Sequence, residues 1–331
     1  MRQNSGNDSN NAGNDAYTDT TAWWRSWRTT CPSCSSPQLE FSDGNAQCRS
    51  CGYVVEEADG VWRFIAGDRL EHFRKFLETY TRVRIAEGRA SYDVPTLRLL
   101  PQCPTSHSLA EQWRIRARSF AKLMKLLRRQ LKLNDRILDL GAGTGWLSHR
   151  LNLAAYRPCA IDLSVDAADG LGASRHFESQ WPCVQAEFDR LPLVDDQGEC
   201  VIFNASFHYC TNQEQAILEA LRVLVPGGLI IILDTPIYSN ESSGRQMLDE
   251  QQLYFEQLIG ERSDALPSSG FLTWTQLAEL ADDFGLDWHV ERPWYGFRWA
   301  VRPLLAKLRG QREPATFAIV WAYKSSSAQT D

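Results

Sequence analysis

The second half of the chain alternates short apolar runs with stretches of helical periodicity. Five runs of strand length follow residue 135, and helix-like stretches near 144–153, 165–175 and 213–224 lie between them. The runs are RILDL (136–140), PCAIDL (158–163), PCVQA (182–186), CVIFNA (200–205) and GLIIILD (228–234). Apolar strands that alternate with helices predict a mainly parallel sheet covered on both faces. Two later runs, LDWHVERP and ATFAIVWAYK, predict strands that close the sheet.

Ahead of this region the apolar spacing predicts helices. Residues 69–90 place apolar side chains at helical spacing, and SLAE at 108–111 is a capping-box signature for a long helix to about Lys132. The segment between them, ASYDVPTLRLLPQCPTS, has three prolines and predicts a loop. Thr273 and Gln276 predict a second capping box near the C-terminus.

Composition narrows the class of protein. The chain has 331 residues, 43% hydrophobic and 23% charged, which is typical of a globular protein with one large domain and a small appendage. Its formal net charge of −6 gives no overall attraction to nucleic acid or anionic membranes. The sequence has no run of the roughly 18 apolar residues that a membrane span needs, and no secretory signal is visible. We therefore expect a cytoplasmic protein.

A glycine-rich turn follows the first strand of the second half. Residues 137–147 read ILDLGAGTGWL, with glycines at 141, 143 and 145. Glycine lets the backbone approach a ligand with no side chain between them. A dinucleotide-binding turn needs the spacing G-x-G-x-x-G, but Trp146 stands at the position of its third glycine. Asp162 closes the second strand, where a carboxylate can accept both hydroxyls of a ribose, and Glu187 follows the third strand, near an adenine edge.

These motifs resemble those of the class I S-adenosylmethionine-dependent methyltransferases, closely over residues 135–235 and loosely to the C-terminus. LDLGAGTG is similar to the first motif of that superfamily, AIDLS to its ribose-binding strand end and AEFDRLPL to its adenine region. VIFNASFHY is similar to its fourth strand and LRVLVPGG to the turn before the fifth. The resemblance implies an α/β, Rossmann-like fold with a seven-stranded, mostly parallel sheet and helices on both faces. It also implies S-adenosylmethionine as cofactor.

The resemblance implies roles for individual residues. Asp139 would hold the cofactor's ammonium group, directly or through water, and Asp162 would bind the ribose hydroxyls. Glu187 stands where the family more often has Asp, so the backbone amide of Phe188 is an alternative contact for adenine. The full set of cofactor-binding candidates is Asp139, Gly141, Ala142, Gly143, Gly145, Asp162, Leu163, Glu187, Phe188 and Asn204.

The catalytic candidates follow the fourth strand, in NASFHY. A methyl group on a sulfonium is already electrophilic, so the protein contributes proximity, alignment and removal of a proton from the acceptor. Asn204 can orient the acceptor, and His208 is the preferred general base because of its side-chain pKa. Tyr209 and Asp234 are further candidates, and a packed, uncatalytic histidine is the alternative interpretation of His208. NASF is not the N-P-P-Y motif of enzymes that methylate nucleobase amino groups.

Four of the nine cysteines form two C-x-x-C pairs near the N-terminus. Cys31 and Cys34 are followed by Cys48 and Cys51, a pattern that supplies four thiolates for a tetrahedral zinc ion. LEFSDGNAQ between them predicts a hairpin that turns at Asp43-Gly44. Four protein ligands leave no open position, so this module predicts structural zinc. A redox pair is the alternative. The module resembles those of zinc-binding 23S rRNA guanine methyltransferases and Trm112-like domains, but the rRNA enzymes have His as the last ligand.

These observations divide the chain and leave three hypotheses of function. The predicted parts are a disordered tail (1–22), a zinc-ribbon module (23–66), a helical connector or lid (67–133), a class I methyltransferase domain (134–325) and a second tail (326–331). The preferred hypothesis is methyl transfer to a small-molecule or lipid-like acceptor, because aromatic residues of 253–299 favour an apolar pocket. The alternatives are an rRNA or tRNA base methyltransferase, supported by the ribbon and eight basic residues in 113–133, and an inactive cofactor-binding scaffold. The sequence does not indicate an oligomeric state.

Overall fold

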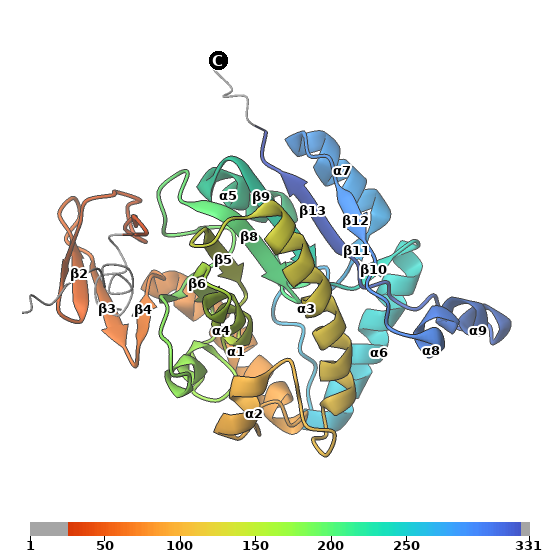
Figure 1. Cartoon of the computed structure of the whole chain (residues 1–331). Coiled ribbons are helices and arrows are strands. Elements are labelled where there is room, and N and C mark those ends of the chain that lie inside the picture. Colours follow the sequence, from red (N-terminus) through yellow and green to blue (C-terminus); the bar gives the residue numbers. More distant parts are fainter. Residues whose placement is uncertain (1–25, 326–331) are drawn as a thin grey trace, which may run out of the picture.

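A single large sheet runs through the molecule from end to end (Figure 1). The computed structural model describes residues 26–325, so the predicted tails 1–22 and 326–331 lie outside the described residues. The sheet has eleven strands in the order β1-β2-β3-β4-β7-β6-β5-β8-β9-β13-β12. A separate two-stranded sheet pairs β10 (Ile237–Tyr238) with β11 (Leu272–Thr273).

Seven neighbouring strands confirm the predicted fold class. Every pair from β7 through β9 is parallel, and β13 runs antiparallel to both β9 and β12. In chain order these strands are β5 (Arg136–Leu140), β6 (Arg157–Asp162), β7 (Cys183–Gln185), β8 (Gly198–Asn204), β9 (Leu224–Leu233), β12 (His289–Glu291) and β13 (Ile319–Tyr323). All five central strands and both closing strands lie where the apolar runs predict them.

Helices cover both faces of this sheet. One face packs against α5 (Gln213–Val223) and α7 (Trp274–Phe284), and the other against α3 (Ala110–Gln130) and α4 (Trp146–Leu153). In β9, Ile230 and Ile232 belong to the first core and Ile231 belongs to the second. Because side chains alternate across a strand, a strand that is buried on both faces must be apolar at every position.

The cysteine module extends the same sheet. Its strands are β1 (Leu39–Ser42), β2 (Asn45–Cys48), β3 (Val54–Ala58) and β4 (Val61–Arg63), and β1 and β2 form the predicted hairpin at Asp43-Gly44. β4 pairs parallel to β7, with Trp62 opposite Val184. Trp27 and Trp62 are buried in the core that also contains α5. The strands of the module therefore share both a sheet and a core with the α/β domain.

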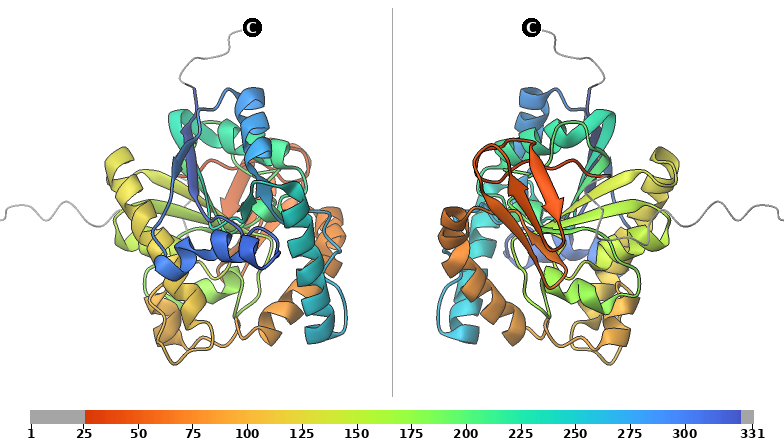
Figure 2. Two further views of the ribbon diagram at one scale, coloured as in Figure 1. Left: turned by 90° about the vertical axis from the view of Figure 1, so that its right-hand side faces the viewer. Right: turned by 90° about the vertical axis from the view of Figure 1, so that its left-hand side faces the viewer.

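The remaining helices lie around the carboxyl ends of the parallel strands. α1 (Gly67–Ala86) contacts α6 (Glu241–Ile259), and Arg82 donates to the carbonyl of Ile259 at 2.8 Å. Two short helices, α8 (Phe297–Ala300) and α9 (Arg302–Leu308), lie at the end of the molecule opposite β1–β4 (Figure 1). The two views of Figure 2 face these two ends.

Three local predictions were wrong. The long helix α3 begins at Ala110, and its N-cap Leu109 has no side-chain capping bond within the described residues, so the capping box at 108–111 is absent. The proline-rich loop contains a helix, α2 (Val94–Leu99), because the Asp93 side chain accepts the Thr96 amide at 2.8 Å and Pro95 fits a first turn. The stretch 165–175 forms only a 3₁₀ helix, η2 (Leu171–His176). The box at Thr273 and Gln276 is confirmed.

Candidate functional site

A cavity of about 500 Å³ lies at the carboxyl ends of β5, β6, β7, β8 and β9. Its floor is made by the turns that follow these strands, and α1, α3 and α6 supply the opposite walls. Ligands of open α/β sheets bind at this edge, because the strand-to-helix turns there present backbone amides and short polar side chains. The cavity therefore gathers most of the predicted site residues in one place.

The glycine turn gives the cavity a backbone wall. Gly141, Gly143 and Gly145 all have positive φ, at 76°, 54° and 78°. The amide of Gly141 donates to the carbonyl of Ile161 at 2.8 Å, which fixes the turn to the end of β6. A Cβ added at Gly141 would lie 2.2 Å from the Cβ of Ser206. Glycine is thus required at 141 by both the conformation and the close approach of the β8 end.

Asp162 faces the cavity and ties the turn to β6. Its Oδ2 accepts the amide of Gly143 at 2.8 Å and its Oδ1 accepts the amide of Ser164 at 2.7 Å. A carboxylate has about four lone-pair positions, so each oxygen retains one for a ligand. Burial raises the pKa of Asp162, and the two amides oppose that rise. The side chain is held in place and still has two acceptor positions toward the cavity.

Asp139 lies beneath the turn, outside the cavity wall. Its Oδ2 accepts the hydroxyl of Ser148 at 2.8 Å, while Oδ1 has no partner among the described residues. Burial raises the pKa of Asp139 to about 7, with a smaller contribution from the charge of Asp162. Asp139 is only 1% exposed, so its position does not support the predicted direct contact with the cofactor's ammonium group. An interaction through water or across the turn is compatible with this position.

The end of β7 places Glu187 and Phe188 on the cavity wall, with Leu163 nearby at the end of β6. Glu187 is buried, and Arg69 of α1 donates to both of its carboxylate oxygens, with Nε 3.0 Å from Oε1. This ion pair joins α1 to the third strand at the site predicted for adenine. The Phe188 ring packs edge-on against Phe203 at 5.9 Å between centroids.

The end of β8 brings the three catalytic candidates to the cavity. Asn204, His208 and Tyr209 all line it, and Asn204 Oδ1 is buried with no partner in the described part of the chain. Ala205, between them, has a φ of +55°, which is uncommon for a residue with a side chain. Strain of this kind is often found where a strand end aims side chains at a ligand. An unpartnered buried amide oxygen points to a donor that a ligand supplies.

The protonation states of His208 and Tyr209 follow from burial. Burial lowers the pKa of His208 to about 4, and the charge of Arg116 contributes. Its Nδ1 lies 3.4 Å from the hydroxyl of Thr235. Burial raises the pKa of Tyr209. At neutral pH the cavity therefore holds a neutral imidazole that can accept a hydrogen bond and a neutral phenol that can donate one.

Arg116 is a site residue that the sequence did not reveal. It lines the cavity from α3 and stacks on the Trp113 ring at 5.2 Å, and no carboxylate or carbonyl among residues 26–325 accepts a hydrogen bond from it. Trp113 in turn contacts the ring of Trp146, which follows the glycine turn. The basic run of α3 predicts a solvated face, but Arg116 lies in register with Trp113 and Leu123 on its apolar face. The position of Arg116 on the apolar face of a predicted helix is the sequence signal that could have identified it as a site residue.

Further charges line the cavity, among them the Arg84–Asp169 pair beside Gly143. Arg84 is paired with the buried Asp169, and Arg312 donates to Glu250 Oε2 at 2.8 Å. Arg302 stacks on Trp299 at 3.9 Å and has no hydrogen-bond acceptor in the described structure. Asp234, at the end of β9, has a φ of +52° and accepts the hydroxyl of Ser119 at 2.6 Å. This part of the cavity combines aromatic walls with cationic groups.

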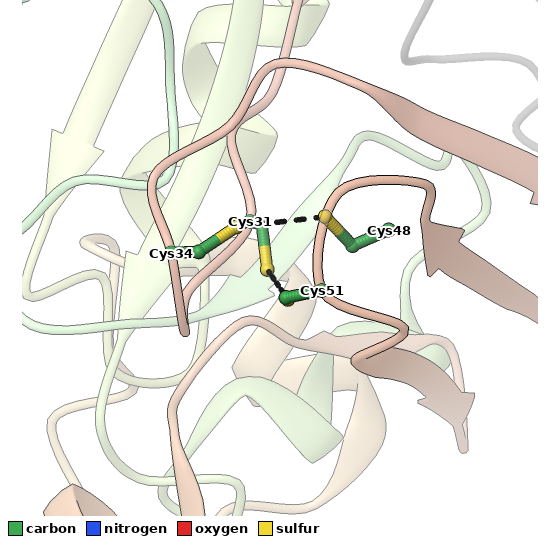
Figure 3. Close-up of side chains that lie close together, drawn as sticks. All are labelled: Cys31, Cys34, Cys48 and Cys51. Atoms are coloured by element: carbon green, nitrogen blue, oxygen red, sulfur yellow. Dashed lines mark hydrogen bonds between the residues drawn. The ribbon is translucent and has the colours of Figure 1, made fainter.

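The four predicted metal ligands gather in the N-terminal module, where Figure 3 shows their side chains close together. Cys31 Sγ lies 3.7 Å from Cys51 Sγ, Cys34 Sγ lies 3.6 Å from Cys48 Sγ, and all four sulfurs lie within 4.8 Å of one another. Four sulfurs placed tetrahedrally at about 2.3 Å from a zinc ion are separated by about 3.8 Å. The geometry of the cluster therefore fits such an ion.

Comparisons with known proteins agree with the site. Residues 138–232 match the family model described as a methyltransferase domain, so this part of the chain is a methyltransferase domain. The malonyl-[acyl-carrier protein] O-methyltransferase of Methylococcus capsulatus is 39% identical over 99 residues, which are 28% of this chain and 34% of that protein. The ubiquinone/menaquinone biosynthesis C-methyltransferase UbiE of Pseudomonas savastanoi pv. phaseolicola is 27% identical over 141 residues, 40% of this chain and 53% of that protein. The matches thus span a third to a half of these relatives.

Solved structures are similar at low sequence identity. The YcgJ protein of Bacillus subtilis is 12% identical, with a TM-score of 0.48 over 63% of this chain and 100% of that one. Phosphoethanolamine N-methyltransferase 2 of Haemonchus contortus is 14% identical, with a TM-score of 0.44 over 62% of this chain and 53% of that one. Similarity at this level carries no information about the substrate.

Proposed function

We propose that this chain is an S-adenosylmethionine-dependent methyltransferase that acts on a small-molecule or lipid-like acceptor. The observation that carries the proposal is the cavity at the strand ends, where the glycine turn, Asp162 and the unpartnered Asn204 Oδ1 meet within a methyltransferase domain. A cofactor that consists of a nucleoside linked to an amino acid needs three neighbouring features in the protein. These are, in order, an acceptor for the ribose hydroxyls, a backbone that the ligand can approach closely, and polar groups at the amino-acid end. The strand ends β6, β5 and β8 offer these groups in the same order.

The cofactor's parts match particular residues. Asp162 would accept the ribose hydroxyls with its two remaining lone pairs, and the wall formed by Glu187 and Phe188 would take the adenine. Gly141 and Gly143 would let the methionine portion pass close to the backbone. Asn204 Oδ1 would accept a hydrogen bond from the ammonium group, which would satisfy its buried oxygen.

Arg116 would hold the carboxylate of the cofactor's methionine portion. The guanidinium lines the cavity beside Trp113, which contacts the helix that follows the glycine turn, and it makes no hydrogen bond or salt bridge within the described residues. Arginine binds carboxylates with two parallel hydrogen bonds and keeps its charge when desolvated. Burial lowers the pKa of Arg116, and Arg89 and Arg84 add repulsion that the nearby charge of Asp234 offsets in part, so an incoming carboxylate would further stabilise the charged guanidinium.

The chain's own contribution to methyl transfer is alignment and control of protons. The cofactor supplies an electrophilic methyl group on a sulfonium. Asn204 and Tyr209 would orient the acceptor atom by hydrogen bonds from the end of β8. His208 stays neutral at physiological pH, because its pKa is lowered to about 4, and is therefore available to accept a proton or a hydrogen bond. Such a weak base suits an acceptor that is already anionic or strongly acidic better than an amine.

The charges of α3 favour a small acceptor over RNA. Arg114 pairs with Glu111, and both Lys122 and Arg129 pair with Glu291. Arg118 lies 3.3 Å from the carbonyl of Trp294, and Arg116 lines the cavity. Five of the eight basic residues of the run thus have partners or lie in the cavity, and the exposed Lys125, Arg128 and Lys132 have no ion pair among residues 26–325, which is a smaller set of charges for RNA phosphates to bind.

Methyl transfer is tested directly with cofactor labelled in its methyl group. We expect label in the small-molecule or organic-soluble fraction of an extract from cells that lack this protein. Asp162→Ala should abolish it, because two hydrogen bonds to a charged acceptor are worth about 3–6 kcal/mol, or at least 100-fold in cofactor affinity. Asp166→Ala is the matched control, since Asp166 accepts two nearby backbone amides at 2.8 and 2.9 Å and does not line the cavity. Label in RNA would overturn the proposed acceptor, and cofactor binding without any label would favour the scaffold.

The cofactor's affinity should depend on pH through Asp139. With a pKa of about 7, Asp139 is largely protonated at pH 6 in the free protein. A cation above the turn favours its ionised form, so affinity should rise by up to about tenfold between pH 6 and pH 8, mostly below pH 7, and level off above pH 8. Calorimetric titrations of wild type and Asp139→Asn check this, since the variant removes this step and retains the titration of the cofactor's own amino group. A wild-type profile identical to that of Asp139→Asn would contradict the interaction.

The four cysteines of the N-terminal module would hold one structural zinc ion. The sulfur separations of 3.6 and 3.7 Å fit a tetrahedral set of thiolates, and four protein ligands leave no position for a reactant. The ion's contribution would be to fold the short strands β1–β3.

A further inference from the structure

The segment 294–311, which contains α8 and α9, projects from the end of the molecule and has an unusual surface. Figure 1 shows both helices beyond α6, and the left view of Figure 2 faces them. Phe297 is 81% exposed and Leu308 is 74% exposed, the two most exposed large apolar side chains in the described structure. The segment's other exposed large apolar side chains are Trp294, Val301, Leu304 and Leu305.

Basic residues surround these apolar side chains. Residues 297–311 contain four basic residues, Arg298, Arg302, Lys307 and Arg309, and no acidic residue in their sequence. The whole chain has a net charge of −6, so this concentration of positive charge is local. Apolar side chains next to Lys and Arg on a short helical segment are the pattern of a surface that binds an anionic lipid interface.

The segment is fixed at both ends. At its start, Tyr295 is buried, and its hydroxyl lies 2.7 Å from Ser119 Oγ and donates to the carbonyl of Phe317 at 3.1 Å. Just beyond its end, Arg312 donates to Glu250 at 2.8 Å and lies 3.3 Å from the hydroxyl of Tyr238. The exposed apolar side chains are therefore presented by an anchored protrusion.

The same segment forms part of the cavity wall. Arg302, the first residue of α9, lines the cavity together with Tyr238 and Arg312. A molecule that lies at an interface contacted by Phe297 and Leu308 would thus be one helix away from the cavity. The exposed apolar residues and part of the cavity wall therefore belong to one continuous segment.

We propose that 294–311 is a membrane-docking surface that inserts its apolar side chains into an anionic lipid bilayer and admits a lipid-like acceptor to the cavity. The choice of acceptor rests on the proposed methyltransferase function, whereas the docking itself does not. The described residues contain no helix that is long and apolar enough to cross a membrane, so the contact is peripheral. Basic side chains attract the anionic headgroups, and Phe297 and Leu308 enter the boundary between headgroups and acyl chains.

Sedimentation of the full chain with lipid vesicles tests the docking surface. We expect binding to vesicles of phosphatidylcholine with about one third phosphatidylglycerol, which is the composition that supplies the negative potential. Binding should be at least tenfold weaker to pure phosphatidylcholine. It should also weaken in Phe297→Ser/Leu308→Ser by more than tenfold, since burial of one such side chain is worth at least that factor. Lys307→Glu/Arg309→Glu should lose at least the roughly fivefold per basic residue that proximity to an anionic surface contributes.

Matched variants separate this surface from general stickiness. Leu133→Ser/Leu153→Ser removes two apolar side chains that are 68% and 60% exposed elsewhere, and Lys125→Glu/Arg128→Glu reverses two exposed charges on α3. Both controls should bind vesicles as wild type does. Equal loss in the controls, no binding to anionic vesicles, or binding of RNA through Lys307 and Arg309 would each overturn the proposal. Cofactor titration of the same variants is independent of lipid, so failure of docking and failure of the methyltransferase function are distinguishable.

Discussion

Gly141→Ala should abolish cofactor binding and destabilise the fold by about 2–5 kcal/mol. The new Cβ would lie 2.2 Å from the Cβ of Ser206, and the residue would have to keep a φ of +76°. The left-handed conformation costs a residue with a side chain about 1–2 kcal/mol, and overpacking in a closed core adds about 1–3 kcal/mol. Ser206 cannot move freely, because its hydroxyl donates to the carbonyl of Leu140 at 2.5 Å. A turn that shifts by about 1 Å would lower cofactor affinity at least 100-fold.

Gly143→Ala is the matched control for this prediction. Gly143 has a φ of +54°, but the nearest atom to an added Cβ is the carbonyl oxygen of Asp169 at 4.0 Å. In this variant only the left-handed backbone conformation should be unfavourable, which lowers the free energy of unfolding by about 1–2 kcal/mol. Chemical denaturation of both variants measures the difference. Equal destabilisation would mean that the turn can move away from Ser206 without a loss in the free energy of unfolding. The close approach of the β8 end would then be unimportant for stability.

A double-mutant cycle isolates the clash itself. Ser206→Gly removes the two atoms nearest to the added Cβ, so Gly141→Ala/Ser206→Gly should be more stable than the sum of the single changes predicts. We expect a coupling free energy of about 0.5–3 kcal/mol, the range for residues in direct contact. Phe188, 3.1 Å from the new Cβ, would limit the recovery. Additive effects would assign the loss to the backbone conformation rather than to Ser206.

The sequence predicts the parts of this site whose signals are local. The glycine turn, Asp162 and Asn204 each stand directly after an apolar run, and a parallel sheet brings such strand ends together. Arg69 and Arg116 could not be placed in this way. The partner of Arg69, Glu187, is 118 residues away, and Arg116 reaches the cavity only because α3 lies beside the glycine turn. The helical register of Arg116 shows that it lies on the apolar face of α3, but which strand ends that face meets depends on tertiary packing, as does the pairing of Arg69 with Glu187.

The same reasoning explains the extended sheet. Two C-x-x-C pairs and a hairpin predict a small module, but nothing within 23–66 indicates a parallel partner for β4. That partner is β7, about 120 residues later, and the pairing uses backbone groups that any sequence has. Trp62 indicates only weakly that the module packs against another part of the chain. So small a module has too few apolar residues to bury a tryptophan by itself. The alternation of apolar runs and helices predicts the five central strands, because burial on both faces makes these strands apolar along their length and so leaves a local signal in the sequence.

Loss of the metal should destabilise the whole protein, because the cysteine module is built into the main sheet. Its strands have only three to five residues each, which is too little apolar surface to fold them alone. We expect one zinc ion per chain by elemental analysis, none in Cys48→Ser, and a loss of about 3–5 kcal/mol in the free energy of unfolding of that variant. The estimate corresponds to exposing a buried tryptophan such as Trp27 or Trp62. Cys103→Ser, a half-buried thiol outside the cluster, should keep its zinc and lose little stability.

The loss of zinc should also weaken binding of the cofactor. β4 is followed after three residues by α1, and Arg69 at the start of α1 holds Glu187 on the cavity wall. If β4 leaves β7, the ion pair loses one of its supports and the adenine end of the cavity loosens. We therefore expect the cofactor's dissociation constant to rise about tenfold in Cys48→Ser, with the larger share from faster dissociation. Unchanged affinity in a zinc-free protein would show that the pairing of β4 with β7 is dispensable for the site. A tenfold loss in Cys48→Ser that Cys103→Ser does not share would instead assign the ribbon a direct part in building the cavity.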